Sequence, residues 1–170
     1  MRRLSLITMA AGAVLMFGTA VYAQQPAAAP PPPPPAYGPT VTLEQAKKAV
    51  AAAVTEAKKA AGYLFVFAVV DPAGNLVYFE KMDSAPTSSV DIVIGKAWTA
   101  ATFKRPSKAF FDAMESGHSF FGQLHPRVTA SAGGIPLVVD GKIVGAIGVS
   151  GGANGLMDNG AAQAGADALK

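Results

Sequence analysis

The chain has 170 residues, 51% of them hydrophobic, with 14 Lys and Arg against 11 Asp and Glu and no cysteine. A chain without cysteine has no disulfides, no thiolate metal sites and no cysteine nucleophile. The formal net charge of +3 is small and no dense basic patch is visible, which argues against a nucleic-acid partner.

The first 23 residues have the pattern of a secretory signal peptide. Arg2 and Arg3 form a basic start, residues 4–17 form an apolar run, and residues 21–23 (Val-Tyr-Ala) resemble a signal peptidase site. The apolar run is shorter than the roughly 20 residues that span a bilayer, so we expect cleavage after Ala23 rather than a permanent membrane anchor. The mature protein is therefore expected to be near neutral and to be periplasmic or secreted.

Residues 24–39 form a tract rich in proline and alanine. Such a segment buries too little apolar surface to fold, so we expect an extended, semi-rigid spacer. A ligand for a proline-binding domain is the alternative interpretation. The remaining residues, 40–170, have the length of one domain that can bury a hydrophobic core.

The first half of this domain predicts a helix followed by a hairpin. Thr42 and Gln45 have the spacing of a capping box, and small and apolar residues recur every three or four positions up to Gly62. Residues 63–70 are aromatic and β-branched, which is typical of a buried strand. Turn-forming residues at 71–75 then lead into a return strand at 76–82.

The second half predicts two helices, a long loop, a second hairpin and a final helix. Ser88 and Asp91 repeat the capping pattern and open a helix that reaches Ala101, and a short helix follows Pro106. Residues 116–134 show little periodicity and form the loop. Strands at 135–139 and 142–150 are joined by an Asp-Gly pair that favours a type I′ turn. The last helix covers 156–169, with Asp158 as its expected cap.

These elements predict an α+β fold in which two hairpins form one antiparallel sheet flanked by helices. Several glycines in or beside the second hairpin need a packing reason, because glycine in a strand costs about 0.5–1 kcal/mol relative to alanine. Gly133, Gly134, Gly145 and Gly148 leave room for a helix, a neighbouring subunit or a flat ligand to approach the sheet. The sequence does not decide among the three.

The catalytic motifs are weak. Residues 148–152 match G-x-S-x-G, but both histidines precede Ser150 and the hairpins do not make the parallel sheet of an α/β-hydrolase. We therefore interpret Ser150 as a turn residue. No dinucleotide fingerprint, P-loop or clear carboxylate pair is present, so binding is favoured over catalysis and enzymatic activity is left open.

The two histidines, His118 and His125, lie on the long loop. A solvated loop histidine is the plain interpretation, but imidazole is also the usual protein ligand of haem iron. His125 stands beside Arg127, which pairs a candidate iron ligand with a candidate propionate partner. Lys96 lies on the apolar side of its helix, where it is either a snorkelling stem or a binding group. Met114 and Tyr63 are alternative iron ligands.

Four segments resemble the GlcG-like, HbpS-like family of secreted haem-binding and haem-degrading-type proteins. They are VTLEQA, AVVDPAGNLVYFEKMDSA, SVDIVIGKAWTA and GGIPLVVDGKIVGAIGVSGG, the last followed by Asp158 and by Ala164-Gly165. The resemblance implies a profilin-like or PAS-like fold, ring-like homo-oligomers, and haem or tetrapyrrole binding in several members. Many relatives carry an acidic residue after the aspartate and a cysteine two positions later, where this chain has Asn159 and Ala161.

Residues and resemblance together lead to the hypothesis of an exported haem- or tetrapyrrole-binding protein that acts in binding, sensing or trafficking. An enzyme that degrades haem or acts on a small metabolite is one alternative, and an oligomeric accessory protein without a small ligand is another. The candidate cofactor-binding residues are His125, His118, Arg127, Lys96, Gly133 and Gly134, with His125 as the metal ligand.

Overall fold

The computed structural model describes residues 32–170, so the predicted signal peptide and the first half of the proline-rich tract lie outside the described residues. Residues 33–170 make one unit. Its elements are α1 (Leu43–Ala57), β1 (Val66–Val70), β2 (Leu76–Lys81), α2 (Ser89–Thr102), α3 (Lys108–Glu115), a 3-10 helix η1 (Ser119–Gln123), β3 (Gly134–Val139), β4 (Lys142–Ser150) and α4 (Gly155–Asp167). Within residues 32–170, no helix is both long enough and apolar enough to cross a membrane.

The four strands form one sheet in the order β2-β1-β4-β3. Each neighbouring pair is antiparallel, and the two hairpins meet through β1 and β4, with Ala68 paired to Phe79 on one side and to Gly148 on the other. The predicted α+β fold, an antiparallel sheet made of two hairpins and flanked by helices, is confirmed. The Asp140-Gly141 turn also has the predicted geometry, because both residues have positive φ.

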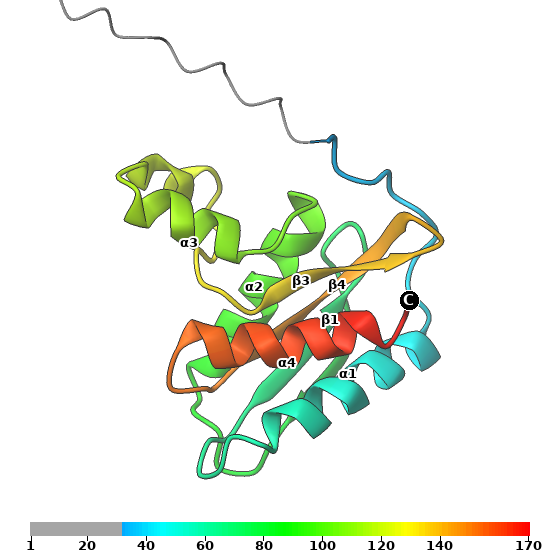
Figure 1. Ribbon diagram of the computed structural model, residues 1–170, viewed down its shortest axis with the longest axis vertical. Coiled ribbons are helices and arrows are strands. Elements are labelled where there is room, and N and C mark those ends of the chain that lie inside the picture. The colour runs from blue at the N-terminus through cyan, green and yellow to red at the C-terminus, as the bar shows by residue number, and fades with distance from the viewer. Residues whose placement is uncertain (1–31) are drawn as a thin grey trace, which may run out of the picture. The chain divides into compact units, whose positions relative to one another are not determined.

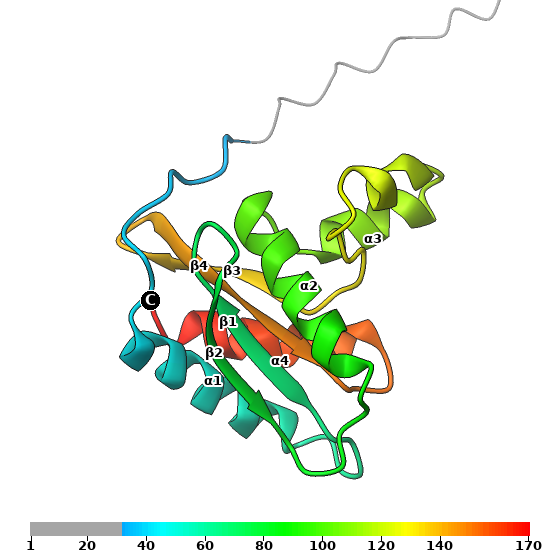
Figure 2. The same ribbon diagram turned by 180° about the vertical axis from the view of Figure 1, so that it is seen from behind.

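Helices cover both faces of the sheet. In Figure 1, α1 and α4 lie together on one face, and in Figure 2, α2 lies on the other, while α3 stands apart from α1 and α4. Successive side chains of β1 point to opposite faces of the sheet, so they pack in two different layers. Phe67 and Val69 pack with α1 and α4, whereas Val66 and Ala68 pack against Val93 of α2. The strand is buried on both sides, which explains why its sequence is uniformly apolar.

Gly148, in the middle of β4, leaves room for α2 to pack close to the sheet. A Cβ on Gly148 would overlap the carbonyl oxygen of Val93 and would lie 3.1 Å from the Ala97 side chain, both on α2. Among the three occupants that the sequence left open for this position, the structure selects the helix.

The end of the proline-rich tract is attached to the domain. Gly38 donates to the Ile143 carbonyl at 2.8 Å, and the Ile143 amide donates to the Ala36 carbonyl at 2.9 Å, so this segment extends the sheet along β4. The Tyr37 hydroxyl donates to the carbonyl oxygens of Ala101 and Thr102 at the end of α2, each at 3.0 Å. The chain is therefore anchored several residues before the first helix.

Several local predictions were wrong. α1 ends at Ala57, and Gly62 lies in the turns that follow. Ser88 makes no capping hydrogen bond because its backbone is already helical, and Ser150 is the buried last residue of β4 rather than a turn residue. Asp158 lies inside α4, whose cap is Asn154, with a side-chain oxygen that accepts from the amides of Leu156 and Met157 at 3.1 Å.

Candidate functional site

The loop between α3 and β3 holds both histidines, and His125 packs against α2. Its ring stacks on Trp98 with centroids 4.7 Å apart and an interplanar angle of 28°, and the guanidinium of Arg127 lies 4.9 Å from the Trp98 ring centre. Trp98 is only 7% exposed, whereas His125 and Arg127 are exposed. The structure therefore brings these two predicted site residues together on one aromatic side chain.

A backbone hydrogen bond selects one tautomer of the neutral His125 ring. The amide of Arg127 donates to His125 Nδ1 at 3.1 Å, so Nδ1 is the acceptor nitrogen of the ring. In a neutral imidazole the other nitrogen, Nε2, then carries the proton and has no lone pair for a metal. In this arrangement His125 can bind iron only after giving up one of its contacts.

His118 makes a longer contact through the same ring nitrogen, Nδ1. The Ser116 hydroxyl donates to the carbonyl oxygens of Asp112 and Ala113 at 2.9 and 3.0 Å, and its oxygen lies 3.4 Å from His118 Nδ1. Which atom donates in this long contact depends on the tautomer of the ring, and in the tautomer in which Nδ1 donates, the lone pair is on Nε2. His118 is exposed, and its ring meets Phe120 edge-on at 6.4 Å.

Lys96 is not near the surface. Its side chain is almost completely buried, and its ammonium lies 2.7 Å from Asp158 Oδ2 and 3.2 Å from the Val149 carbonyl. The second oxygen of Asp158 accepts from the Gly152 amide at 2.9 Å. Burial lowers the pKa of Lys96, while the charge of Asp158 and its hydrogen bond oppose that shift. The pair joins α2 to α4 across the end of β4.

Gly133 and Gly134 pack against the residues of this ion pair. A Cβ on Gly133 would lie 2.8 Å from the Asp158 side chain and 2.6 Å from the Val149 carbonyl, and one on Gly134 would overlap the Lys96 carbonyl. The two glycines let α2 and α4 approach the start of β3. Their predicted contact with a cofactor, like that of Lys96, stays a prediction.

Asn159 marks a departure from the pattern that the sequence resemblance implies. It stands directly after Asp158, where many relatives carry an acidic residue, and its Oδ1 is buried without a hydrogen-bond partner in the described part of the chain. Residues 32–170 also contain no group of three His, Asp or Glu side chains arranged to hold a metal ion.

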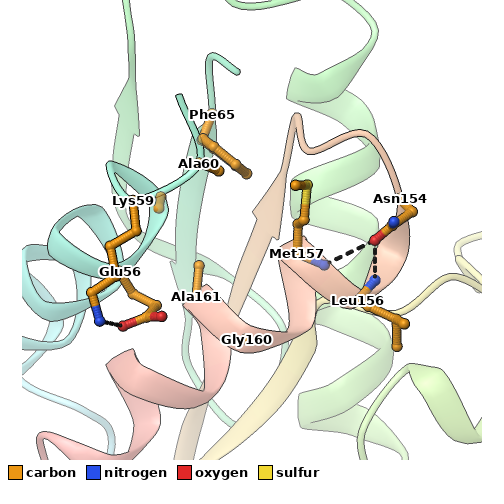
Figure 3. A pocket seen from close by; sticks show the side chains of 10 residues that line it. Glu56, Lys59, Ala60, Phe65, Asn154, Leu156, Met157, Gly160 and Ala161 are labelled. Atoms are coloured by element: carbon orange, nitrogen blue, oxygen red, sulfur yellow. Dashed lines mark hydrogen bonds and ion pairs between the residues drawn. The ribbon is translucent and has the colours of Figure 1, made fainter. Parts of the chain in front are cut away.

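A pocket of about 480 Å³ opens between the end of α1 and the start of α4. Figure 3 shows Met157 projecting from α4 toward the side where Ala60 and Phe65 lie, while Leu156 projects the other way. The floor is apolar, and the Glu56–Lys59 ion pair stands at the rim with a separation of 2.5 Å. Its walls come from segments about 100 residues apart, so no local sequence pattern indicates this pocket.

A family model described as haem degrading protein HbpS-like matches residues 41–167. The chain belongs to the HbpS-like family. Among curated relatives, an uncharacterised 15.0 kDa protein from the dhaT-dhaS intergenic region of Citrobacter freundii is 40% identical over 116 residues, which cover 66% of this chain and 81% of that protein. Protein GlcG of Escherichia coli K12 is 35% identical over 107 residues, which cover 63% and 79%. The predicted family is confirmed.

Solved structures agree with this HbpS-like assignment. HbpS itself has a TM-score of 0.71 and 33% identity over 78% of this chain and 92% of that chain. Klebsiella pneumoniae ORFY has a TM-score of 0.70 and 35% identity over the same shares. A structure of a PduOC:heme complex has a TM-score of 0.69 and 26% identity, and the match covers 77% of this chain and 96% of that chain.

Asp158 pairs with Lys96, although its sequence position predicted a helix cap. A lysine on the apolar side of a helix needs a counter-charge once it is buried. The predicted last helix, 156–169, contains two acidic residues, Asp158 and Asp167. The lysine therefore predicts a buried counter-charge, but the sequence does not say which residue supplies it.

Proposed function

We propose that this HbpS-like protein binds haem or a related tetrapyrrole and acts in binding, sensing or trafficking. The observation that carries the proposal is the match to the PduOC:heme complex, which extends over 96% of that chain at 26% identity. The family description, which refers to haem, supports the same ligand.

The residues around His118 fit a haem group. In the tautomer in which its Nδ1 donates to Ser116, its Nε2 has the lone pair that an axial iron ligand needs, and the ring is exposed at the surface. Phe111, Met114 and Phe120 on α3 and η1 are also exposed, by 43%, 38% and 53%. They offer an apolar surface for a flat macrocycle. Haem bound here would supply the visible absorption and the redox-active iron.

The other predicted site residues are ranked by their contacts. His125 is the second candidate ligand, because binding iron through Nε2 requires the ring to give up its hydrogen bond from the Arg127 amide. The Arg127 guanidinium is exposed on Trp98 and remains a candidate propionate partner. Lys96 is already paired with Asp158 in the interior, so it ranks below both.

Haemin titration of the full chain tests the proposal. We expect a shifted Soret band that saturates at micromolar haemin, and replacement of His118 by alanine should move the band or weaken binding at least tenfold. His125→Ala is the matched control, and it should keep the wild-type spectrum. Failure to saturate at micromolar haemin would overturn the proposed function, and an unchanged spectrum in His118→Ala would overturn the ligand assignment.

Haem degradation is the second candidate, favoured by the description of the family model. Addition of a reductant and oxygen to the haem complex distinguishes the two activities. A binding protein keeps its Soret band, whereas a degrading enzyme loses it and yields a defined bile pigment. We expect the band to persist, and its conversion to such a product would establish the enzyme.

Export and self-assembly are further parts of the proposal. The amino-terminal sequence of protein recovered from outside the cytoplasm should begin at Gln24, directly after the expected cleavage site. Recovery of the intact chain from the cytoplasm would contradict export. Sedimentation of the purified protein should give a mass several times that of one chain, and a monomer would contradict the proposed homo-oligomer.

A further inference from the structure

The sheet has two outer strands, and each has one free edge. The order β2-β1-β4-β3 leaves β2 and β3 with one neighbour each, and Figure 2 shows β2 at the margin beside β1. The backbone N–H and C=O groups that point outward from such a strand can pair with another strand, and proteins usually cover or block them. What each outward group contacts therefore decides whether the sheet can be extended.

The free edge of β3 is blocked by the chain itself. The Gly134 amide donates to Ser107 Oγ at 2.8 Å, and the Gly134 carbonyl accepts from the Ser107 amide at 2.9 Å. Pro136, the next residue with the same orientation, has no N–H to offer. A register shift between Leu137 and Val138 follows and interrupts the edge. This side of the sheet offers little to another strand.

The free edge of β2 has no such protection. The amide of Met82 donates to the Phe65 carbonyl at 3.0 Å. The adjoining pair in the ladder, Lys81 with Val66, is therefore not hydrogen-bonded, and such pairs alternate along the two strands. Lys81 and Phe79 accordingly direct their N–H and C=O groups away from β1. Within residues 32–170 no hydrogen bond reaches these groups from another element, and β2 contains no proline.

The side chains of β2 are self-complementary. Tyr78 and Glu80 lie on the same face of the strand, where the Tyr78 hydroxyl donates to the Glu80 carboxylate at 3.1 Å. Two antiparallel copies of β2 related by a two-fold axis at Phe79 place Tyr78 of each copy opposite Glu80 of the other. An axis at Glu80 would instead set two carboxylates against each other. The axis at Phe79 thus matches donors with acceptors, and it also brings the outward backbone groups of Phe79 together.

We propose that β2 of one chain pairs antiparallel with β2 of a second copy about a two-fold axis at Phe79. The two sheets then form one continuous sheet, because the N–H and C=O of Phe79 in each copy bond the same residue of the other. This inference rests on the proposed homo-oligomer and assigns the surface through which two chains meet. The contact by itself makes a closed dimer, so a larger assembly uses a second surface as well.

A disulfide tests this register directly, because the chain contains no cysteine. Residues that face each other in a hydrogen-bonded pair have Cα atoms about 5.5 Å apart, within the roughly 4.4–6.8 Å that a disulfide spans. Phe79→Cys in the full chain should therefore give a covalent dimer on a non-reducing gel after mild oxidation. Leu76→Cys is the matched control, because Leu76 is 51% exposed on the same strand. Its two copies would lie about 20 Å apart, so this variant should stay a single chain.

A second pair of variants leaves Phe79 in place. Tyr78→Cys and Glu80→Cys chains with different tags, expressed together, should cross-link to each other, because these two positions face each other in the proposed register. Each of the two variants expressed alone should cross-link much less.

Assembly is measured by sedimentation of the full chain. Lys81→Pro removes an outward donor without removing a hydrogen bond to β1, so it should raise the dissociation constant of the dimer at least tenfold. Lys81→Ala, which keeps the N–H, should assemble as the wild type does.

Phe79→Cys chains that cross-link no better than Leu76→Cys chains would overturn this pairing, and so would assembly that Lys81→Pro leaves unchanged. If the wild type still sediments as several chains, either result would place the contact on another surface and leave the homo-oligomer intact. A wild type that sediments as a single chain would contradict the homo-oligomer itself, and this pairing with it.

Discussion

At the scale of single residues, the Lys96–Asp158 ion pair stands out because both charged groups are buried in the interior. Both side chains are withdrawn from water, and their charges are satisfied by each other, by the Val149 carbonyl and by the Gly152 amide. Desolvation of such a pair consumes much of its Coulombic attraction, but removing one partner leaves an uncompensated charge in the core. The main effect of the pair is therefore to determine how α2 and α4 pack together. Its net contribution to stability is smaller.

Lys96→Met should lower the free energy of unfolding by about 3–5 kcal/mol, because it strands the Asp158 carboxylate. The double variant Lys96→Met with Asp158→Leu should recover most of that loss, since no buried charge remains. Urea unfolding of the two variants and the wild type measures both values. A single variant within about 1 kcal/mol of wild type, or a double variant no better than the single one, would contradict the account.

Tyr37 gives a pH-dependent test of the anchored segment before α1. Burial raises the pKa of its hydroxyl above the ordinary value of 10.0. A raised folded pKa means that the contribution of the hydroxyl is complete below pH 10 and is lost as the pH rises through the folded value. The pH range in which the contribution of the Tyr37 hydroxyl to stability is lost is therefore alkaline.

Tyr37→Phe should cost about 1 kcal/mol or less at neutral pH, where the hydroxyl donates to the end of α2. The difference in free energy of unfolding between this variant and the wild type should shrink above pH 10, because the wild type loses its contribution there. Urea unfolding at several alkaline pH values measures the trend. A difference that stays constant or widens with pH would exclude this role for the hydroxyl.

At the scale of elements, a local sequence pattern predicts some of the helix caps and glycines. It does not predict the others. The Thr42–Gln45 box forms in full because all of its atoms lie within one turn. The Ser88 cap fails because its backbone is already helical, and the Asp158 cap fails because its side chain pairs with Lys96 instead. Asp158 is held by Lys96, a residue 62 positions away, and no local signal reports that distance.

Two glycines of regular elements should respond oppositely to alanine. Gly148→Ala should cost about 3 kcal/mol, because its Cβ overlaps the Val93 carbonyl and α2 must move. Gly160→Ala should raise the free energy of unfolding by about 0.5–1 kcal/mol, since nothing opposes its Cβ and the helix gains a better former. Thermal and urea unfolding compare the pair. Equal effects of the two changes would show that the difference in packing around the two glycines does not affect the free energy of unfolding.

At the scale of the whole molecule, the fold followed from local signals to a large extent. Each hairpin is fixed by its own turn, the Asp140-Gly141 pair in one case and residues 71–75 in the other, and the Asp71 carboxylate holds the second by accepting from the Asn75 amide at 2.8 Å. The antiparallel pairing of β1 with β4 then joins them into one sheet.

The candidate site was less accessible to sequence reasoning. The stacking of His125 on Trp98 is a tertiary contact, and the contact of Ser116 with His118 is a local one in a loop that has no periodic pattern. The sequence could nominate two histidines by their chemistry, but it could not say which nitrogen of each ring is free. The proposed order of the two iron ligands rests on the Arg127 amide, which donates to His125 Nδ1.

The central claim is that the protein binds haem iron through His118. Its most direct measurement is the iron anomalous signal from crystals of the full chain grown with haemin. We predict one strong peak at coordination distance from His118 Nε2, beside Phe120. A peak at His125 or at Met114, or no ordered iron in the presence of saturating haemin, would contradict the account.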